Sequence, residues 1–277
     1  MTTLAPTAPA FTELDNRRAG TGFGHVLRSE WTKVWSLRST FWTLLGLVTL
    51  TIGLSTLAAW GQTSSLKHMS PGDLAAQDPT NMAMSGLILG QLAIAVLGVL
   101  VVCSEYSTGG IKVTFTAVPD RMRVLAAKGV VLAAIATVVG MITAFGAFFA
   151  AMPFWAHYDM AAHLGDPGVL RAVLGGGLYV LASGMFGLAI GSVIRHTAGA
   201  ITTVVGLLFV APGLTELLPG EWGDQIAKHF TSNAGQRITE VVHSTSQLHP
   251  WPGYLTFTLW WVIPLALGAW LIKRRDA

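Results

Sequence analysis

Long apolar runs separated by short polar segments dominate this chain. Six runs come close to the roughly 20 residues that an α-helix needs to cross a bilayer. They cover approximately Thr40–Trp60, Met84–Cys103, Val124–Met152, Leu170–Ile194, Gly199–Leu218 and Tyr254–Ile272. This pattern predicts an all-α membrane protein with six transmembrane helices.

The segment just before the first run, Phe23–Arg38, has a different, amphipathic pattern. Its apolar positions at helical spacing are Phe23, Leu27, Trp31, Val34 and Trp35, and the opposite face carries Ser29, Thr32, Lys33 and Ser36. Two tryptophans on the apolar face are typical of a helix lying in the membrane interface, an N-terminal elbow. A short soluble helix packed on a core is the alternative. Residues 1–22, which hold no apolar core, are expected to be a disordered tail before a six-span domain at residues 23–277.

Composition supports the membrane interpretation. The chain of 277 residues is 52% hydrophobic and only 11% charged, whereas soluble domains carry about 25% charged residues. The basic residues flank apolar runs and form no patch with aromatic side chains, which argues against nucleic-acid binding. The single cysteine, Cys103, excludes an internal disulfide framework.

The distribution of charge predicts the orientation, because cytoplasmic loops are rich in Lys and Arg. With the N-terminus inside, the cytoplasmic side holds most of the 17 basic residues: Arg17, Arg18, Arg28, Lys33, Arg38, Lys112, Arg121, Arg123, Lys128, Arg195, Lys273, Arg274 and Arg275. The outside keeps Lys67, Arg171, Lys228 and Arg237. We therefore expect a multi-pass protein of the cell membrane with both termini cytoplasmic. The longest external loop, Pro219–Gly253, is too polar to span and should form short helices before the last span.

Several kinds of catalytic motif are absent from the sequence. No glycine is directly followed by lysine, so the chain has no P-loop, and H-E-x-x-H, C-x-x-C and G-x-S-x-G are also missing. His157, Asp159 and His163 match no standard metal signature and are interpreted as solvated loop residues. Charged residues are nearly absent from the spans, which argues against a proton pump or an ion channel. We expect a chain that is not itself an enzyme, with a lipid-modifying enzyme or a membrane anchor as alternatives.

Glycine pairs within the spans indicate close helix packing. Gly86 and Gly90 form one G-x-x-x-G, and Gly187 and Gly191 form another. Small residues at this spacing let helices approach in lipid, either within the protomer or in a dimer. Pro212-Gly213 should bend the outer end of the fifth span.

The polar segment Ser104–Lys128, between the second and third spans, is the most distinctive stretch of the chain. Gly109 and Gly110 permit a sharp reversal, and Ile111–Val118 is long enough for two helical turns at the membrane surface. Asp120 is placed to cap the third span. Arg121, Arg123 and Lys128 then line the start of that span, where they can meet headgroups or carboxylates of a partner.

This segment, E-Y-S-T-G-G-I-K-V-T-F-T-A-V-P-D-R-M-R-V-L-A-A-K, resembles the first cytoplasmic loop of ABC type-2 permeases. These are membrane subunits of ATP-binding-cassette transporters, here of the bacterial exporter type. The N-terminal S-E-W-T-K-V-W-S-L-R-S-T-F-W is similar to the interfacial elbow that opens many bacterial members. The Gly109-Gly110 pair departs from the usual Gly-Thr of the family.

The resemblance implies two permease copies and a separate ATPase subunit that holds ATP and magnesium, with no cofactor in this chain. A coupling helix within Gly110–Val118 would dock on the ATPase. The residues implied in that contact are Glu105, Gly109, Gly110, Ile111, Lys112, Phe115, Pro119 and Arg121. The second and fifth spans would line the pathway, where candidate contacts to a hydrophobic or amphipathic substrate (a drug, antibiotic, lipid or peptide) are Gln91, Thr202, Thr203 and Phe209.

Overall fold

The computed structural model describes residues 22–66, 69–70, 72, 74, 77–242 and 247–274, and every regular element in these ranges is a helix. The helices in chain order are α1 (Phe23–Ser36), α2 (Arg38–Ser65), α4 (Pro79–Ala83), α5 (Leu87–Ser107), α6 (Gly110–Ala117), α7 (Arg121–Ala156), α8 (Val169–Ile194), α9 (Thr197–Val205), η4 (Gly206–Val210), α10 (Ala211–Thr215), α11 (Gly220–His229), α12 (Thr231–Gln236), η5 (Arg237–Thr239) and α13 (Pro250–Arg274). Residues 1–21 of the tail expected at residues 1–22, together with Lys67, Asp73 and Arg275, lie outside these ranges.

Six helical segments of the described chain are long and apolar enough to cross a membrane. They are α2, α5, α7, α8, α13 and the continuous stretch Thr197–Thr215, which combines α9, η4 and α10. The prediction of an all-α membrane protein with six spans is thereby confirmed. One boundary difference that matters for the site is at α5, which runs on to Ser107, so Glu105 lies in its last turn instead of after it.

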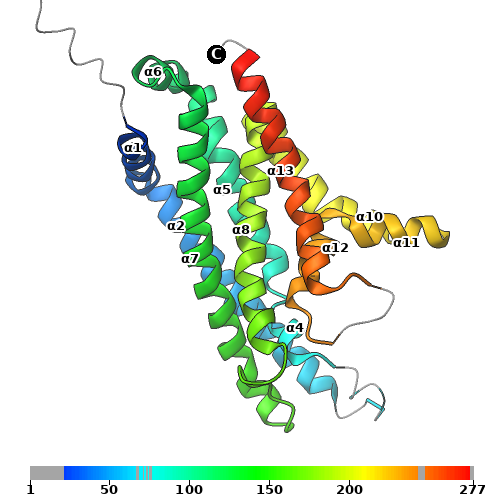
Figure 1. Ribbon diagram of the computed structural model, residues 1–277. Coiled ribbons are helices and arrows are strands. Elements are labelled where there is room, and N and C mark those ends of the chain that lie inside the picture. The colour runs from blue at the N-terminus through cyan, green and yellow to red at the C-terminus, as the bar shows by residue number, and fades with distance from the viewer. Residues whose placement is uncertain are drawn as a thin grey trace, which may run out of the picture.

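The two ends of the bundle are easily told apart in Figure 1. At one end α1 and α6 lie beside the start of α7 and the end of α13; we call this the α6 end. At the other end α4 and η5 lie against the start of α8; we call this the α4 end. Helices α10 and α11 project sideways from the bundle (Figure 1).

Helix α8 is the centre of the bundle and is buried along most of its length. Its glycines allow backbones to touch. A Cβ atom at Gly187 would collide with the carbonyl oxygen of Ala95 in α5, and one at Gly98 of α5 would collide with that of Gly184. Because lipid provides no hydrophobic drive between helices, such close packing is what holds spans together.

Both predicted glycine pairs serve packing within the protomer. Gly187 and Gly191 meet α5, and Gly86 and Gly90 lie against Thr51 of α2. The backbone N–H of Gly86 also donates a hydrogen bond of 3.1 Å to the Ser55 hydroxyl.

The fifth span departs from regular α-helical geometry, but this irregularity lies one turn earlier than the Pro212-Gly213 pair predicts. The segment η4, Gly206–Val210, is a π-helix, and Pro212 is the second residue of the short helix α10 that follows. Pro212 cannot donate the usual backbone hydrogen bond to the preceding turn. The Thr231 hydroxyl of α12 donates a hydrogen bond of 2.6 Å to the carbonyl of Leu207, which ties the π-helical segment to the loop helices.

Candidate functional site

The short helix α6 crosses the α6 end of the bundle, as the sequence predicts for Ile111–Val118. Gly109 adopts a φ of 71°, a left-handed conformation that turns the chain sharply out of α5. At the other side Asp120 caps α7, accepting hydrogen bonds from the backbone N–H groups of Met122 and Arg123 at 3.2 and 3.3 Å. Both the reversal and the cap are confirmed.

One face of α6 is buried and the other is open. Ile111 is only 5% exposed and Phe115 packs against the small apolar cluster of Val26, Val124 and Ala127. Val113, by contrast, is 72% exposed, and Lys112 and Thr116 are exposed beside it. The helix therefore presents a mixed apolar and basic surface outward.

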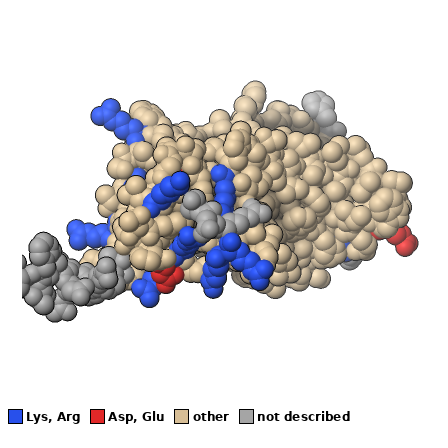
Figure 2. Space-filling view, turned by 90° about the horizontal axis from the view of Figure 1, so that it is seen from above, with Lys and Arg blue, Asp and Glu red and all other residues tan. Residues whose placement is uncertain are grey.

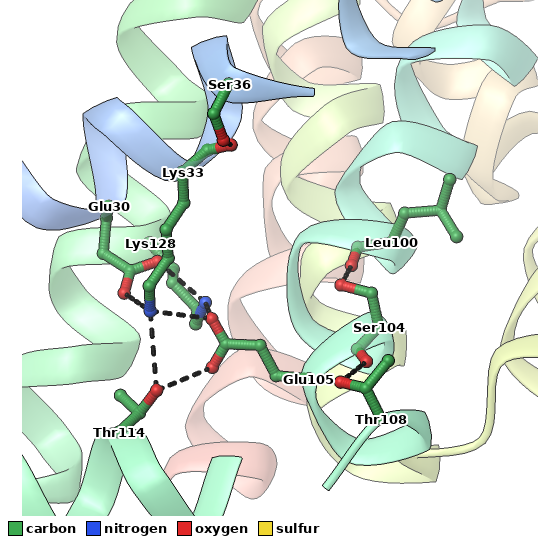
Figure 3. A network of polar contacts seen from close by, with 9 residues as sticks. All are labelled: Glu30, Lys33, Ser36, Leu100, Ser104, Glu105, Thr108, Thr114 and Lys128. Carbon is green, nitrogen blue, oxygen red and sulfur yellow. Dashed lines mark hydrogen bonds and ion pairs between the residues drawn. The ribbon is translucent and has the colours of Figure 1, made fainter. Parts of the chain in front are cut away.

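Beneath α6 lies a cluster of charged side chains from three other helices (Figure 3). Lys128 of α7 bonds to Glu30 of α1 at 2.8 Å and to Glu105 of α5 at 2.6 Å. Lys33 of α1 bonds to the same two carboxylates, at 2.6 Å and 2.9 Å. We call these four residues the ionic cluster.

The ionic cluster is electrically balanced, with two carboxylates facing two ammonium groups. Glu30 and Lys128 are each 4% exposed at the side chain, and Glu105 is 15% exposed. Burying such charges is costly, so they must stay paired. Only Lys33, at 40%, reaches solvent appreciably. Burial alone lowers the pKa of Lys33, but hydrogen bonds to Glu30 and Glu105 outweigh burial and raise it above 10.5.

Helix α6 is attached to the cluster through Thr114. Its hydroxyl lies 3.4 Å from a Glu105 carboxylate oxygen and 3.5 Å from the Lys33 ammonium, at the long limit of hydrogen bonding. A groove of about 310 Å³ runs between α1 and α6, lined by His25, Ser29, Val113 and Ala117 among others. The cluster thus connects α1, α5 and α7, while α6 rests on it through weak contacts.

The structure corrects one interpretation of the basic residues that follow α6. Lys128 does not meet headgroups or partner carboxylates, because its ammonium is enclosed between Glu30 and Glu105. Arg123 is exposed and pairs with Asp120 at 2.8 Å. Arg121 donates a hydrogen bond of 3.2 Å to the carbonyl of Ile272 at the end of α13, and its guanidinium also lies over the Phe115 ring.

The candidate pathway residues do not form one surface within the protomer. Gln91 is 1% exposed; it accepts a hydrogen bond from the Tyr179 hydroxyl, which in turn accepts one from Gln236 at 3.3 Å. Thr202 is exposed and Phe209 is 45% exposed on the fifth span. The sequence missed that Gln91 joins α5 to α8 and to the loop helix α12.

Glu30 is the functional candidate that sequence reasoning overlooked. It lies on the buried side of α1 with Val26 and Val34, four residues from each. A carboxylate in the middle of an apolar i, i+4, i+8 stripe was the available signal. Trp31 and Trp35, expected on the same face as Val34, are 44% and 50% exposed.

Metal binding finds no support in the described residues, among which there is no group of three or more His, Cys, Asp or Glu side chains placed to hold an ion. Asp159, one of the loop residues considered for a metal site, adopts a left-handed φ of 55° in the turn after α7.

Six apolar spans, with α8 buried among the others and a short helix across one end, are the features of a multi-pass membrane protein. The family model described as ABC-2 family transporter protein matches residues 36–277, and the chain belongs to that family. The matched region begins at the last residue of α1, so Glu105 and Lys128 lie inside it and Glu30 and Lys33 lie before it. A search of curated proteins found no match.

Proposed function

We propose that this chain is the membrane-spanning permease subunit of an ATP-binding-cassette exporter, driven by a separate ATPase subunit that docks on α6. The observation that carries the proposal is the arrangement of α6, which exposes Val113 and Lys112 outward and rests inward on the ionic cluster. ATP and magnesium would be held by the partner, since this chain has no P-loop sequence.

The α6 end would face the cytoplasm of a cell, with both termini on that side. Figure 2 looks onto this end and shows many Lys and Arg side chains with few Asp or Glu. The basic residues described at this end include Arg28, Arg38, Lys112, Arg121, Arg123, Arg195, Lys273 and Arg274. Such an excess is typical of the cytoplasmic side of a membrane protein.

Coupling would run from α6 into the spans through the ionic cluster. A push on α6 reaches Thr114 and Glu105, and Lys128 passes the displacement to α7 while Glu30 passes it to α1. Closure of an ATPase pair would in this way rock the spans between two states. Glu105, Gly109, Gly110, Ile111, Lys112, Phe115, Pro119 and Arg121 remain the proposed coupling residues.

The substrate would be a hydrophobic or amphipathic compound crossing between two permease copies. The exposed faces of Thr202 and Phe209 on the fifth span are available to such a pathway. The Thr203 hydroxyl donates a hydrogen bond of 2.8 Å to the carbonyl of Gly199. Gln91 would contribute only after a rearrangement that opens α5 from α8.

The proposal is tested by purifying the tagged chain with the ABC ATPase encoded nearest to it and measuring ATP-driven transport in proteoliposomes. Val113→Asp should abolish ATPase capture without unfolding the chain, because Val113 contacts little of the protomer. Leu217→Asp is the matched control, since Leu217 is 78% exposed beyond the fifth span and should leave capture unchanged.

A second measurement separates docking from coupling. Glu105→Ala should preserve ATPase capture and ATP hydrolysis while transport falls at least tenfold, and a proline within Lys112–Thr116 should likewise uncouple hydrolysis from transport. Wild-type transport in both variants would contradict a coupling role for Glu105 and α6. A chain that modifies lipids, or one that only anchors a complex, would give no ATP-dependent transport with any partner.

A further inference from the structure

An apolar groove runs between α7 and α13 on the outside of the bundle, in the half of the spans nearest the α6 end. Its volume is about 510 Å³, within the usual size range of ligand pockets. Much of its lining is small: Ala126, Gly129, Ala133, Ala266 and Ala269, with Met185 of α8 also contributing. We call it the α7–α13 groove.

The groove exists because two helices approach α8 without closing on each other. Met185 forms its floor, and its Cε atom would lie 3.8 Å from a Cβ atom at Gly129. At the α6 end the hydrogen bond from Arg121 to the Ile272 carbonyl joins the two helices. Between small side chains in a membrane no hydrophobic force would close the remaining gap.

Basic side chains flank the mouth of the groove. Val262, Ala266 and Ala269 line it at helical spacing, and the same face of α13 continues to Lys273. Lys273 is exposed and has no ion-pair partner among the residues that the structure describes. Arg123 is exposed on α7 beside the other wall, where it pairs with the half-exposed Asp120.

Aromatic anchoring places this mouth at headgroup level. The guanidinium of Arg274 lies 4.4 Å from the centre of the Trp270 ring, and Trp270 is 48% exposed. Tryptophan beside a basic residue at the end of a span is typical of the membrane–water interface. The groove therefore begins at the depth of the phosphates and continues into the hydrocarbon.

We propose that the α7–α13 groove binds one anionic phospholipid of the adjacent leaflet. An acyl chain would lie against Gly129 and Met185, and the phosphate would be held by Lys273 and Arg123. Basic pockets between transmembrane helices select anionic headgroups in this manner. The wholly apolar lining suits a hydrocarbon chain, which needs no polar partner along its length.

The direct test uses phosphatidylglycerol with a photoreactive group in its acyl chain, reconstituted with the purified chain in phosphatidylcholine vesicles. The photoreactive phosphatidylcholine of the same chain length serves as the reference. Phosphatidylglycerol should label α7 between Met122 and Ala133 several-fold more than the reference does, as mapped by mass spectrometry. Equal labelling by the two lipids would reduce the groove to ordinary lipid contact and overturn the proposal.

Headgroup recognition is tested with Lys273→Gln. The preference for phosphatidylglycerol should fall about fivefold, the equivalent of about 1 kcal/mol for one basic residue near the surface. Arg28→Gln is the matched control, because Arg28 is an exposed cation of the same end but lies on α1. An equal effect of both variants would mean that only the general surface charge matters, contrary to the proposal.

Binding of the acyl chain is tested by filling the groove with Ala266→Leu. Labelling at α7 by both lipids should be lost, whereas Ala134→Leu, at an exposed position of α7 outside the lining, should leave it intact. Unchanged labelling in Ala266→Leu would contradict binding in the groove. Elution as a single size-exclusion peak confirms that both variants fold.

A second copy of the chain is the competing occupant. Cys103 is the only cysteine and is buried, so Ala266→Cys in a Cys103→Ala background reports contact between copies. No disulfide dimer is expected. Efficient dimer formation would show a protein interface at the groove and exclude the lipid. None of these assays needs the ATPase, so their outcome is independent of the proposed function.

Discussion

Charged side chains hold the two ends of the bundle together in opposite ways. At the α6 end charges bond to other charges, because Lys128 lies between Glu30 and Glu105 on two different helices. At the α4 end one charge pair, Arg237 with Glu240, is present, but the bonds between distant segments run from charges to the backbone, through Arg171 at the start of α8 and Asp78 before α4. One end is a set of exchangeable side-chain pairs, and the other fixes the path of a loop.

Four bonds at the α4 end converge on η5 and the segment that follows it. Arg171 donates to the carbonyls of Ile238 and Glu240 at 3.0 and 2.7 Å. Asp78 accepts from the backbone N–H groups of Val241 and Val242 at 2.7 and 3.0 Å. Each contact ties a charged side chain to a fixed point of the backbone, so together they define the path of this segment.

The ionic cluster permits more than one arrangement. Each ammonium contacts both carboxylates, so the helices can shift while every charge keeps at least one partner. In the proposed function the α6 end receives force, which suits an element with more than one arrangement, whereas a pinned loop suits an end that only closes the bundle. Substitutions at the two ends should therefore have different consequences.

The largest effect is expected from Lys128→Met. The substitution leaves Glu30 and Glu105 facing each other with only Lys33 between them. Breaking a buried pair by removing one partner costs about 3–5 kcal/mol. The apparent melting temperature of the detergent-solubilised chain, followed by size-exclusion fluorescence, should fall by many degrees.

Two further variants show whether charge is the cause of the loss of stability in Lys128→Met. Lys128→Arg should keep most of the stability, since a guanidinium can serve both carboxylates. Adding Glu30→Gln to Lys128→Met restores neutrality and should recover part of the loss. A double variant as unstable as the sum of both single variants would contradict the cluster as a coupled unit.

The next effect in size is expected from Arg171→Met, at about 2 kcal/mol, because two carbonyls lose a charged donor. The loss of local structure should be confined to the α4 end. Limited proteolysis should cleave near Glu240 faster than in the wild type, while ATPase capture through α6 is unaffected. Cleavage spreading to the α5–α6 junction would show that the two ends are not independent.

The fold could be predicted from the sequence because each membrane span is a long run of consecutive apolar residues. Six apolar runs predicted six spans, and glycine and proline marked the limits of α6. The tight turn between α8 and α9 was also predictable, since only Arg195 and His196 separate these helices. Each of these features depends on residues close together in the chain.

The ionic cluster could not be predicted, since it joins residues far apart in sequence. Lys128 lies 98 residues from Glu30, and nothing local distinguishes it from Arg123, which is exposed. Its burial follows from the packing of α1 against α7. The burial of Gln91 likewise depends on Tyr179, which lies 88 residues away.

A smaller effect is expected from Asp78→Asn at the α4 end. One carboxylate oxygen caps α4 by accepting from the Asn81 N–H at 2.9 Å, while the other holds Val241 and Val242. The amide keeps only one acceptor oxygen, so one of these roles is lost, at a cost of about 1 kcal/mol. Hydrogen exchange should accelerate at Val241 and Val242, with the Lys128 region unchanged as the internal control.

The smallest effect concerns Lys33, the exposed member of the ionic cluster. Its pKa is raised by the carboxylates, so its contribution is complete below 10.5 and is lost only as the pH rises through the higher folded-state value. Because Lys33 is 40% exposed, solvent screening limits that contribution to about 1 kcal/mol or less. Melting curves of the wild type and Lys33→Met should therefore differ by a small, constant amount across neutral pH and converge only in strong alkali. A difference that varies between mildly acidic and neutral pH would instead assign the titration to another group, and charge pairing by Lys33 would then not be what stabilises the α6 end.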